Sequence, residues 1–313
     1  MRTPRPDKMR LADRGHDNRD RVVRFRFNGR DLEGMEGDSL ASALLAHGIH
    51  FVARSFKYHR PRGIFSAGAE EPNALVQVGE SPALTEPNLR ATQVEIHEGL
   101  NAHSQNAHPS LRFDLQAITD RFWRLMPAGF YYKTFMAPAR WWGLYERMIR
   151  RAAGMGQAPE GPDPDRYDHR HEHCDLLIVG AGPAGLAAAQ IAGRAGARVI
   201  LADEQDRPGG HLLSEPDSRH WIDRQVSALA AMDNVTVLRR ATVFGAYHDN
   251  FFGLVERVTE HLPPDQRPRF APRQRFWQIR ARQALMATGM LERPLVFHLN
   301  DRPGIMLAGA VRR

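Results

Sequence analysis

A glycine-rich segment at residues 180–185 carries the clearest chemical signal in the sequence. It reads GAGPAG and lies between an apolar run, DLLIV, that is typical of a buried strand and an alanine-rich run, LAAAQIAGRAG, that is typical of a helix. In such a strand–turn–helix unit, Gly180 permits a tight turn, Gly182 lets the backbone approach a pyrophosphate, and Gly185 lets the helix pack on the strand. The helix N-terminus then faces the phosphates. We therefore predict that a dinucleotide contacts Gly180, Ala181, Gly182, Pro183, Ala184 and Gly185.

An acidic residue ends the next apolar run. The stretch ARVILAD is a second strand-like segment that closes at Asp203, with Glu204 beside it. A carboxylate at this place accepts hydrogen bonds from an adenosine ribose, so we predict that Asp203 and Glu204 bind the ribose. It also disfavours the 2′-phosphate of NADP, because two like charges about 4 Å apart cost roughly 1–4 kcal/mol in a partly wet site. The motif does not choose between NAD and FAD, because both carry the same ADP half.

Two later segments belong to the same site in our interpretation. Gly209 and Gly210 allow a loop to pass close to the dinucleotide, and Thr288 and Gly289 end a strand-like stretch, ARQALMATG, where the chain can return to the cofactor. Taken with GAGPAG, these landmarks indicate a Rossmann-type FAD/NAD(P)-binding domain with a parallel sheet, which we place at residues 172–313.

The sequence between these landmarks alternates as a β-meander does. The stretches ATVFGAYHDNFFGLVE and RFWQIRA have the period of half-buried strands, and Asp249 and Asn250 supply a turn between two of them. We expect this meander to cover one side of the parallel sheet.

The N-terminal part has the pattern of a small β-grasp domain, which we place at residues 21–100. The run VVRFRF alternates, and Asn28 and Gly29 then supply the two left-handed residues of a type I′ hairpin turn. Ser39 offers a helix N-cap before LASALLAHG, which ends in a glycine stop. Two more strand-like runs that complete the predicted sheet lie at residues 74–78 and 92–96. The predicted fold class is therefore α/β, with a β-grasp domain followed by a Rossmann-type domain.

The remaining segments connect or extend these domains. Residues 1–20 are charged and lack periodicity, so we expect a flexible basic arm. Residues 101–171 are predicted to be a helical connector in which the many aromatic side chains indicate packing. The Pro- and Asp-rich stretch at residues 158–173 marks the domain boundary. The histidines and the cysteine at the end of this stretch have two interpretations, a metal site and a solvated linker. We favour the linker, because a metal site needs ordered residues around its ligands and a linker rarely supplies them. The residues concerned are His169, His171, His173 and Cys174.

Composition narrows the classes of function. The formal net charge is +7, but the basic residues are scattered, which disfavours nucleic-acid binding. The basic stretch at residues 54–62, RSFKYHRPR, has two interpretations, a phosphate or nucleic-acid contact and a structured loop against a neighbouring domain, and we favour the loop. Cys174 is the only cysteine, which excludes an intramolecular disulfide or a Cys-rich cluster from this chain alone and fits a cytoplasmic location. No uninterrupted apolar run is long enough to predict a membrane helix.

From residue 22 to its end, the chain resembles the N-terminal third of the alpha subunits of the heterotetrameric sarcosine oxidase family. The matching segments are GDSLASALLAHG, RSFKYHRPRGIFSAGAEEPNALV, AGFYYKTFM, IRRAAGMG, CDLLIVGAGPAGLAAA, DEQDRPGGHLL and ATGMLERPLVFHLNDRPGIMLAGAV. The resemblance implies that the β-grasp domain is 2Fe-2S ferredoxin-like but cluster-free, since residues 54–68 contain no cysteine. It also implies that the Rossmann-type domain is incomplete at its C-terminal end.

The resemblance further implies cofactors and partners. It implies a tightly bound NAD at the site in this chain, with FAD as the alternative there, and FMN and tetrahydrofolate in the full complex. The partners are then the beta, gamma and delta subunits, and electrons from the substrate pass to FAD on the beta chain. No metal ligand or catalytic residue is assigned to this chain.

The activity that the resemblance implies is oxidative demethylation of sarcosine. The products are glycine, hydrogen peroxide, and formaldehyde or 5,10-methylene-tetrahydrofolate. Two alternatives stay open: a subunit of a two-component opine or hydroxyproline-type dehydrogenase, and a non-catalytic nucleotide-binding scaffold or truncated fragment. The isolated chain is expected to be inactive in every case.

Overall fold

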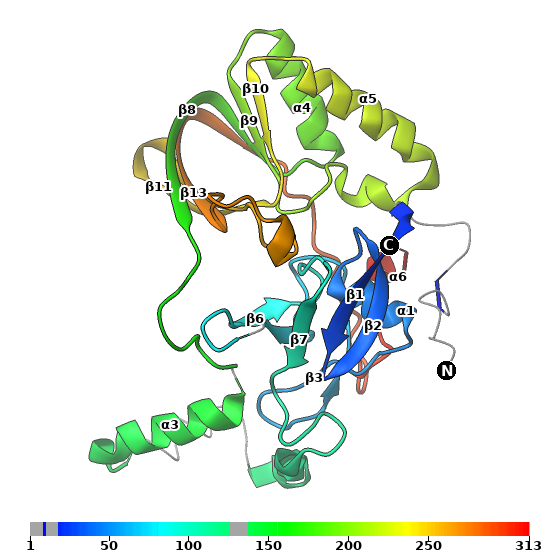
Figure 1. The fold of residues 1–313 in the computed structure, drawn as a ribbon, viewed down its shortest axis with the longest axis vertical. Coiled ribbons are helices and arrows are strands. Elements are labelled where there is room, and N and C mark those ends of the chain that lie inside the picture. The colour runs from blue at the N-terminus through cyan, green and yellow to red at the C-terminus, as the bar shows by residue number, and fades with distance from the viewer. Residues whose placement is uncertain (1–8, 11–17, 80, 126–136, 155, 313) are drawn as a thin grey trace. The chain divides into compact units, whose positions relative to one another are not determined.

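The computed structural model describes residues 9–10, 18–79, 81–125, 137–154 and 156–312. Most of the predicted basic arm and the segment GFYYKTFM lie outside these residues. The chain divides into two compact units, which Figure 1 shows as a ribbon. Unit 1 consists mainly of Asp17–Pro164 and Arg293–Arg312, and unit 2 mainly of Asp165–Glu292. Among the described residues, no helix combines the length and apolar character that crossing a bilayer requires.

Unit 1 is built on a five-stranded sheet in the order β2-β1-β7-β5-β6. Its strands are β1 (Asn18–Phe27), β2 (Arg30–Glu36), β5 (Leu75–Val78), β6 (Glu86–Arg90) and β7 (Leu100–Ser104). A small two-stranded sheet pairs β3 (Ala53–Arg54) with β4 (Pro61–Arg62). The predicted hairpin forms as expected: β1 and β2 are antiparallel, and the turn residues Asn28 and Gly29 have φ angles of 50° and 75°.

Helix α1 (Leu40–Ala46) packs on this sheet. The Ser39 side chain caps it by accepting a hydrogen bond from the backbone N–H of Ser42, as the sequence predicts. Leu40 and Leu44 are fully buried and join Phe25 and Val76 in the core of the unit. Hairpin, helix and mixed sheet together give the predicted β-grasp fold.

Residues 92–96 form no strand, contrary to the prediction. The segment instead passes the N-terminus of α1, where the carbonyl of Val94 accepts from the Leu40 N–H at 2.7 Å and the Ile96 N–H donates to the Asp38 carbonyl at 3.0 Å. The Ile96 side chain is buried in the core. The alternation of polar and apolar residues at 92–96 therefore reflects burial beside a helix. Strands β6 and β7 complete the sheet in place of this segment.

In the part of the predicted connector that the structure describes, three helical segments belong to unit 1. They are η1 (Leu115–Leu125), η2 (Ala139–Trp141) and α3 (Trp142–Ala153). Several of their aromatic side chains are exposed in the structure, although aromatic residues at this density indicate packing.

Residues 293–312, which the sequence assigns to the Rossmann-type domain, group with unit 1 in the structure. The segment includes helix α6 (Ala308–Arg312). The Leu307 N–H donates to the Phe65 carbonyl at 2.8 Å, and Arg62 forms an ion pair with Asp301. These are long-range contacts that local patterns do not encode.

Unit 2 contains a six-stranded sheet in the order β10-β9-β8-β13-β12-β11. The strands are β8 (Tyr167–Val179), β9 (Val199–Ala202), β10 (Val235–Leu238), β11 (Ala241–Tyr247), β12 (Phe251–Arg257) and β13 (Gln274–Met286). The helices are α4 (Pro183–Arg194) and α5 (Arg219–Ala230), with short 3-10 turns η3 (Gly210–Ser214), η4 (Pro216–Ser218), η5 (His248–Asn250) and η6 (Pro264–Gln266). Strands β8, β9, β10 and β13 run parallel, and β11 and β12 are antiparallel additions.

Two cores cover the two faces of this sheet. Helices α4 and α5 pack on one face (Figure 1), where Leu186 and Leu229 meet Ile178 and Leu201. On the other face, Leu254 and other side chains of the meander form one cluster with residues of β8 and β9. The meander thus covers a face of the parallel strands while continuing the same sheet, and is not a separate layer.

The end of the predicted linker is also part of this sheet. Strand β8 begins at Tyr167, and it pairs in parallel with β13 along its whole length, so that His169, His171 and His173 lie opposite Phe276, Gln278 and Arg280. No group of His, Cys, Asp or Glu suited to a metal ion occurs among the residues that the structure describes. The linker therefore ends earlier than predicted, because pairing with a distant strand orders its last residues.

Candidate functional site

The glycine loop of unit 2 joins the end of β8 to the start of α4. Gly180 has a φ angle of 102°, and a Cβ atom there would lie 2.4 Å from the carbonyl oxygen of Ala287. At Gly185 a Cβ atom would lie 1.9 Å from the carbonyl oxygen of Gly180. Both positions therefore require glycine for the backbone to fold. Gly182 differs, because a Cβ atom there would meet nothing within 4 Å.

This difference separates two reasons for a glycine. Gly182 is the N-cap of α4 and has a φ angle of −70°, which any residue can adopt. Neither backbone conformation nor packing explains its small size. The open space beside its backbone lies at the N-terminus of a helix, where N–H groups and the helix dipole favour phosphate, as the predicted pyrophosphate contact requires.

The structure brings the three predicted landmarks together around this loop. The Gly209 N–H donates to the Ala181 carbonyl at 2.8 Å, and a Cβ atom on Gly210 would lie 3.0 Å from the Cα of Gly182. From the other side, the Cα of Thr288 is 3.3 Å from the Cβ position of Gly180. Gly289 follows with a φ angle of 75°. Segments far apart in the sequence thus converge on one loop.

Asp203 follows the last residue of β9, where the sequence places the ribose acid. Its Oδ2 accepts from the Ala181 N–H at 2.6 Å, and its Oδ1 accepts from the Gln205 N–H at 2.8 Å. The carboxylate is therefore fixed against the glycine loop. Beside it, the backbone carbonyl of Glu204 accepts from the guanidinium of Arg257 at 2.7 Å, which holds the start of this loop to β12.

Pro183 and Ala184 begin α4, and their environments differ from those of the glycines. Pro183 occupies the first turn, where its missing N–H costs no helical hydrogen bond. Ala184 is exposed, whereas Ala181 and Gly185 are buried. All the residues predicted to contact the dinucleotide thus lie on or beside the same loop. Their binding of the dinucleotide stays a prediction.

A buried carboxylate that the sequence analysis missed organises a loop in unit 1. Glu71 is 1% exposed. Its Oε2 accepts from the N–H groups of Phe65 and Ser66, both at 2.7 Å, and its Oε1 accepts from those of Asn73 and Ala74 at 2.7 and 3.0 Å. One side chain therefore satisfies four backbone donors. Glu71 follows another glutamate, Glu70, and no local pattern marks which of the two is buried.

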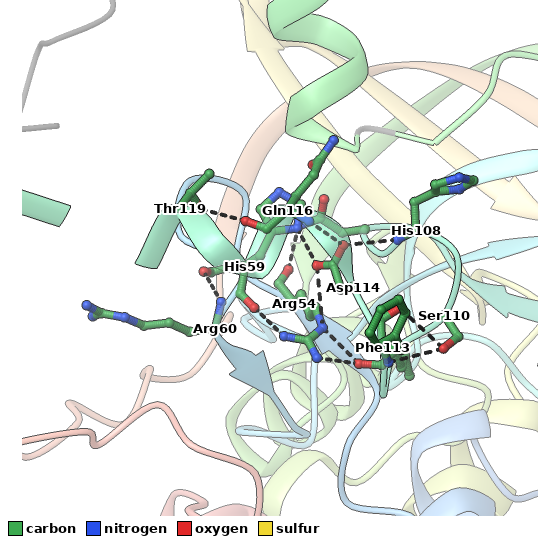
Figure 2. A network of polar contacts seen from close by, with 12 residues as sticks. Arg54, His59, Arg60, His108, Ser110, Phe113, Asp114, Gln116 and Thr119 are labelled. Atoms are coloured by element: carbon green, nitrogen blue, oxygen red, sulfur yellow. Dashed lines mark hydrogen bonds and ion pairs between the residues drawn. The ribbon is translucent and has the colours of Figure 1, made fainter. Parts of the chain in front are cut away.

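A second buried network holds the basic stretch at residues 54–62. Figure 2 shows Arg54 directed at backbone carbonyls: its guanidinium donates to the carbonyls of His59 and Leu111 at distances of 2.5 to 2.8 Å. The Nδ1 of His59 donates to Asp114 at 2.7 Å. Arg54 is 9% exposed and already paired, so it is not presented to a phosphate. The structured-loop interpretation fits this arrangement, with a segment of the same unit as the neighbour.

Cys174, the only cysteine, is buried at the centre of β8. Burial, with a smaller contribution from the Asp175 carboxylate, raises the pKa of its thiol to about 11. It is therefore protonated at neutral pH and is a packing residue rather than a nucleophile.

Two known domain families match parts of the chain. The 2Fe-2S iron-sulfur cluster binding domains match residues 20–107, and the NAD(P)-binding Rossmann-like domains match residues 178–242. The structure of L-proline dehydrogenase from P. horikoshii is similar to 94% of this chain, with a TM-score of 0.56 and 20% sequence identity, and the match covers 45% of that structure. This likeness concerns the fold.

Three curated relatives cover different shares of the chain. The alpha subunit of sarcosine oxidase from Rhizobium meliloti (strain 1021) is 55% identical over 97% of this chain, and that from Corynebacterium sp. (strain U-96) is 40% identical over 94%. A subunit of opine oxidase from Agrobacterium tumefaciens (strain Ach5) is 35% identical over 44% of the chain. The chain spans 31%, 26% and 28% of the lengths of these relatives, respectively.

The residues of unit 1 do not fit the cluster for which its domain family is named. A two-iron cluster is held by four cysteine thiolates, or by two cysteines and two histidines. Cys174 is the only cysteine of the chain, and it lies in unit 2. Within unit 1, the carboxylate of Glu71 holds the loop at residues 65–74 through four backbone N–H groups.

Proposed function

Because this chain belongs to the sarcosine oxidase alpha-subunit family, we propose that it forms the dinucleotide-binding part of an enzyme that demethylates sarcosine. The proposed reaction converts sarcosine, water and dioxygen to glycine, formaldehyde and hydrogen peroxide, or passes the one-carbon unit to tetrahydrofolate. Identity of 55% over nearly the whole chain carries this proposal. The chain spans about a third of that relative, and the complete activity is part of the proposal.

We propose that the cofactor of this chain is NAD, held by the loop at residues 180–185. The open space at Gly182 and the carboxylate of Asp203 beside it support a dinucleotide whose ribose carries no 2′-phosphate. FAD is the alternative, since it shares the ADP half. We assign no catalytic residue to this chain, and we propose that the redox step on sarcosine takes place on a flavin of a partner protein in the assembly.

The cofactor proposal is tested by denaturing the purified chain and identifying the released molecules by mass spectrometry and absorbance. NAD without a flavin band is the expected result, and a stoichiometric flavin would overturn the assignment. Gly182→Ala is expected to abolish dinucleotide retention and to melt at the temperature of the cofactor-free unmodified chain, because its added methyl group meets no atom of the chain within 4 Å. Gly143→Ala is the matched control, because a Cβ atom there also meets nothing within 4 Å and the residue lies in α3, outside unit 2.

The proposed reaction is tested on the complete alpha chain assembled with its beta, gamma and delta subunits. Sarcosine-dependent peroxide formation is expected from the assembly, and none from the 313-residue chain alone. An assembly that does not oxidise sarcosine would overturn the proposed reaction.

Opine oxidation is the second candidate. It is favoured by the 35% identity with the opine oxidase chain of Agrobacterium tumefaciens over 150 residues. The same assembly assayed with an opine in place of sarcosine separates the two reactions.

A further inference from the structure

The helical segment η1 of unit 1 is attached to its unit through polar side chains. Asp114, directly before η1, is 8% exposed and accepts from the N–H groups of His108 and Gln116, both at 3.2 Å. Further along, the hydroxyl oxygen of Thr119 lies 3.2 Å from the Lys57 carbonyl oxygen and 2.8 Å from that of Gln116, so its single proton is shared between them. Surface helices normally turn their polar side chains to water and their apolar side chains to the core. Here polar groups make the contacts with the rest of the unit.

Ion pairs reinforce this attachment. The carboxylate of Asp114 lies 2.7 Å from the Nδ1 of His59 and 3.5 Å from the Nε of Arg54, and Figure 2 shows these side chains converging on it. On η1 itself, the Asp120 carboxylate accepts from the Arg60 guanidinium at 2.6 Å. The carboxylates of Asp114 and Asp120 are therefore each paired with an arginine, Arg54 and Arg60 respectively. The orientation of η1 is fixed rather than left to local preference.

The apolar side chains of η1 are consequently exposed. Their relative exposures run from 51% to 76%, whereas large apolar side chains in the core of unit 1 are 5% exposed or less. We call these five residues the η1 apolar surface: Leu115, Ile118, Phe122, Trp123 and Leu125. Five large apolar side chains exposed on one segment of eleven residues indicate a binding surface in a stable protein. Tryptophan and phenylalanine are also typical of the centre of protein interfaces.

The charges around this surface are positive. Arg112, Arg121 and Arg124 are all exposed, and Arg124 lies over the ring of Trp123, with its guanidinium carbon 5.6 Å from the ring centroid. The two carboxylates nearby, on Asp114 and Asp120, already pair with Arg54 and Arg60. The surface therefore offers an apolar centre with a basic rim, which is complementary to an apolar groove lined at its edges by carboxylates.

We propose that the η1 apolar surface is the docking site for a partner subunit of the oxidase, which receives it in an apolar groove rimmed by Asp or Glu side chains. This inference rests on the proposed function, since the relatives are named as subunits. Aromatic side chains bury about 150–250 Å² each, so Phe122 and Trp123 provide the centre of an interface that neighbouring segments enlarge. The buried Asp114 network sets the direction in which that centre points.

A photo-cross-linking experiment tests the proposal directly. The photoreactive residue p-benzoylphenylalanine is introduced at Phe122 of the complete alpha chain, which is assembled with its partner subunits and irradiated. The expected product is one adduct that joins the alpha chain to a partner protein of the oxidase, at an apolar residue close in sequence or structure to acidic residues. An adduct with a second copy of the alpha chain, with another part of the same chain, or with lipid would overturn the proposal, as would the absence of any adduct.

Substitutions supply the second measurement. Ile118→Asp combined with Trp123→Ser is expected to weaken assembly at least tenfold, as followed by native mass spectrometry over a dilution series. Ile191→Asp is the matched control, because Ile191 is 72% exposed on α4 of unit 2 and lies outside the proposed surface. Circular dichroism melting of each variant checks that the fold is retained. Assembly equal to that of the control would contradict the proposal.

Reversal of the rim charge tests the complementarity. Arg121→Glu with Arg124→Glu is expected to weaken assembly several-fold at low salt and to make it less sensitive to added salt. An unchanged salt dependence would contradict the acidic rim. The proposed function and the proposed docking site fail in different ways. If the unmodified chains assemble with no partner, the proposed function is overturned. If assembly is unchanged by these substitutions, the docking site alone is overturned.

Discussion

The carboxylate of Asp203 lies 2.6 Å from the backbone nitrogen of Ala181, so the acid that ends one strand holds the glycine loop that follows another. Its second oxygen accepts from the Gln205 N–H at 2.8 Å. Asp203 therefore shapes the loop before any ligand arrives, and in the proposed site it also contacts the ribose.

Asp203→Asn is predicted to weaken dinucleotide binding about tenfold or more. In asparagine an NH2 group replaces one of the two carboxylate oxygens, and this group cannot accept a hydrogen bond from a backbone N–H. Hydrogen bonds to a charged group are worth roughly 1.5–3 kcal/mol each. Isothermal titration with NAD on cofactor-free protein measures the change. Asp206→Asn in the same loop is the control and is expected to bind normally. Equal affinities for the two variants would remove Asp203 from the site.

Gly185→Ala is predicted to destabilise unit 2, in contrast to Gly182→Ala. The added methyl group would lie 1.9 Å from the Gly180 carbonyl oxygen, so α4 must move away from β8. Overpacking of this kind costs about 1–3 kcal/mol. Chemical denaturation of both variants tests the difference. Equal stability of the two variants would show that the helix adjusts freely, and that the third glycine has no packing role.

Glu71→Gln is predicted to lower the free energy of unfolding of unit 1 by roughly 2–4 kcal/mol. Glutamine has one acceptor oxygen where the carboxylate serves four backbone N–H groups at two oxygens, and a buried donor left unpaired is costly. Urea denaturation followed by circular dichroism measures the loss. Glu70→Gln is the control, because Glu70 is exposed. Its effect is expected to stay within about 0.5 kcal/mol.

The thiol of Cys174 is predicted to resist alkylation in the folded chain. Its pKa is raised from 9.0 to about 11, mainly by burial, so little thiolate exists at pH 8. Iodoacetamide is expected to label the chain only after urea is added, as followed by intact mass, and all labelling reports this residue because the chain has one cysteine. Rapid labelling of native protein at pH 8 would contradict the buried position.

The same pKa shift predicts a pH dependence of stability. The neutral thiol is favoured in the folded state, so the folded pKa is above the unfolded value. Above pH 9 the unfolded thiol ionises first, and stability is lost progressively as the pH rises toward 11. Cys174→Ala is expected to show a smaller loss over this window than the unmodified chain.

Local signals predicted the parts of the structure that depend on local chemistry. The left-handed pair Asn28 and Gly29, the Ser39 cap and the glycine loop at residues 180–185 are each set by backbone conformation or a nearby hydrogen bond. Residues 167–173 were harder to predict, because their strand depends on pairing with β13 about a hundred positions later. The same is true of Glu71 and Asp114, since their burial depends on tertiary contacts.

The loop that closes around Glu71 has a consequence for how the protein is made. A metallo-domain whose loop is held by a cluster folds fully only when metal is delivered, and it is vulnerable when that metal is lost. Here the anion at the centre of the loop is part of the polypeptide, supplied during translation. Production of the ferredoxin-like unit is thereby uncoupled from iron supply.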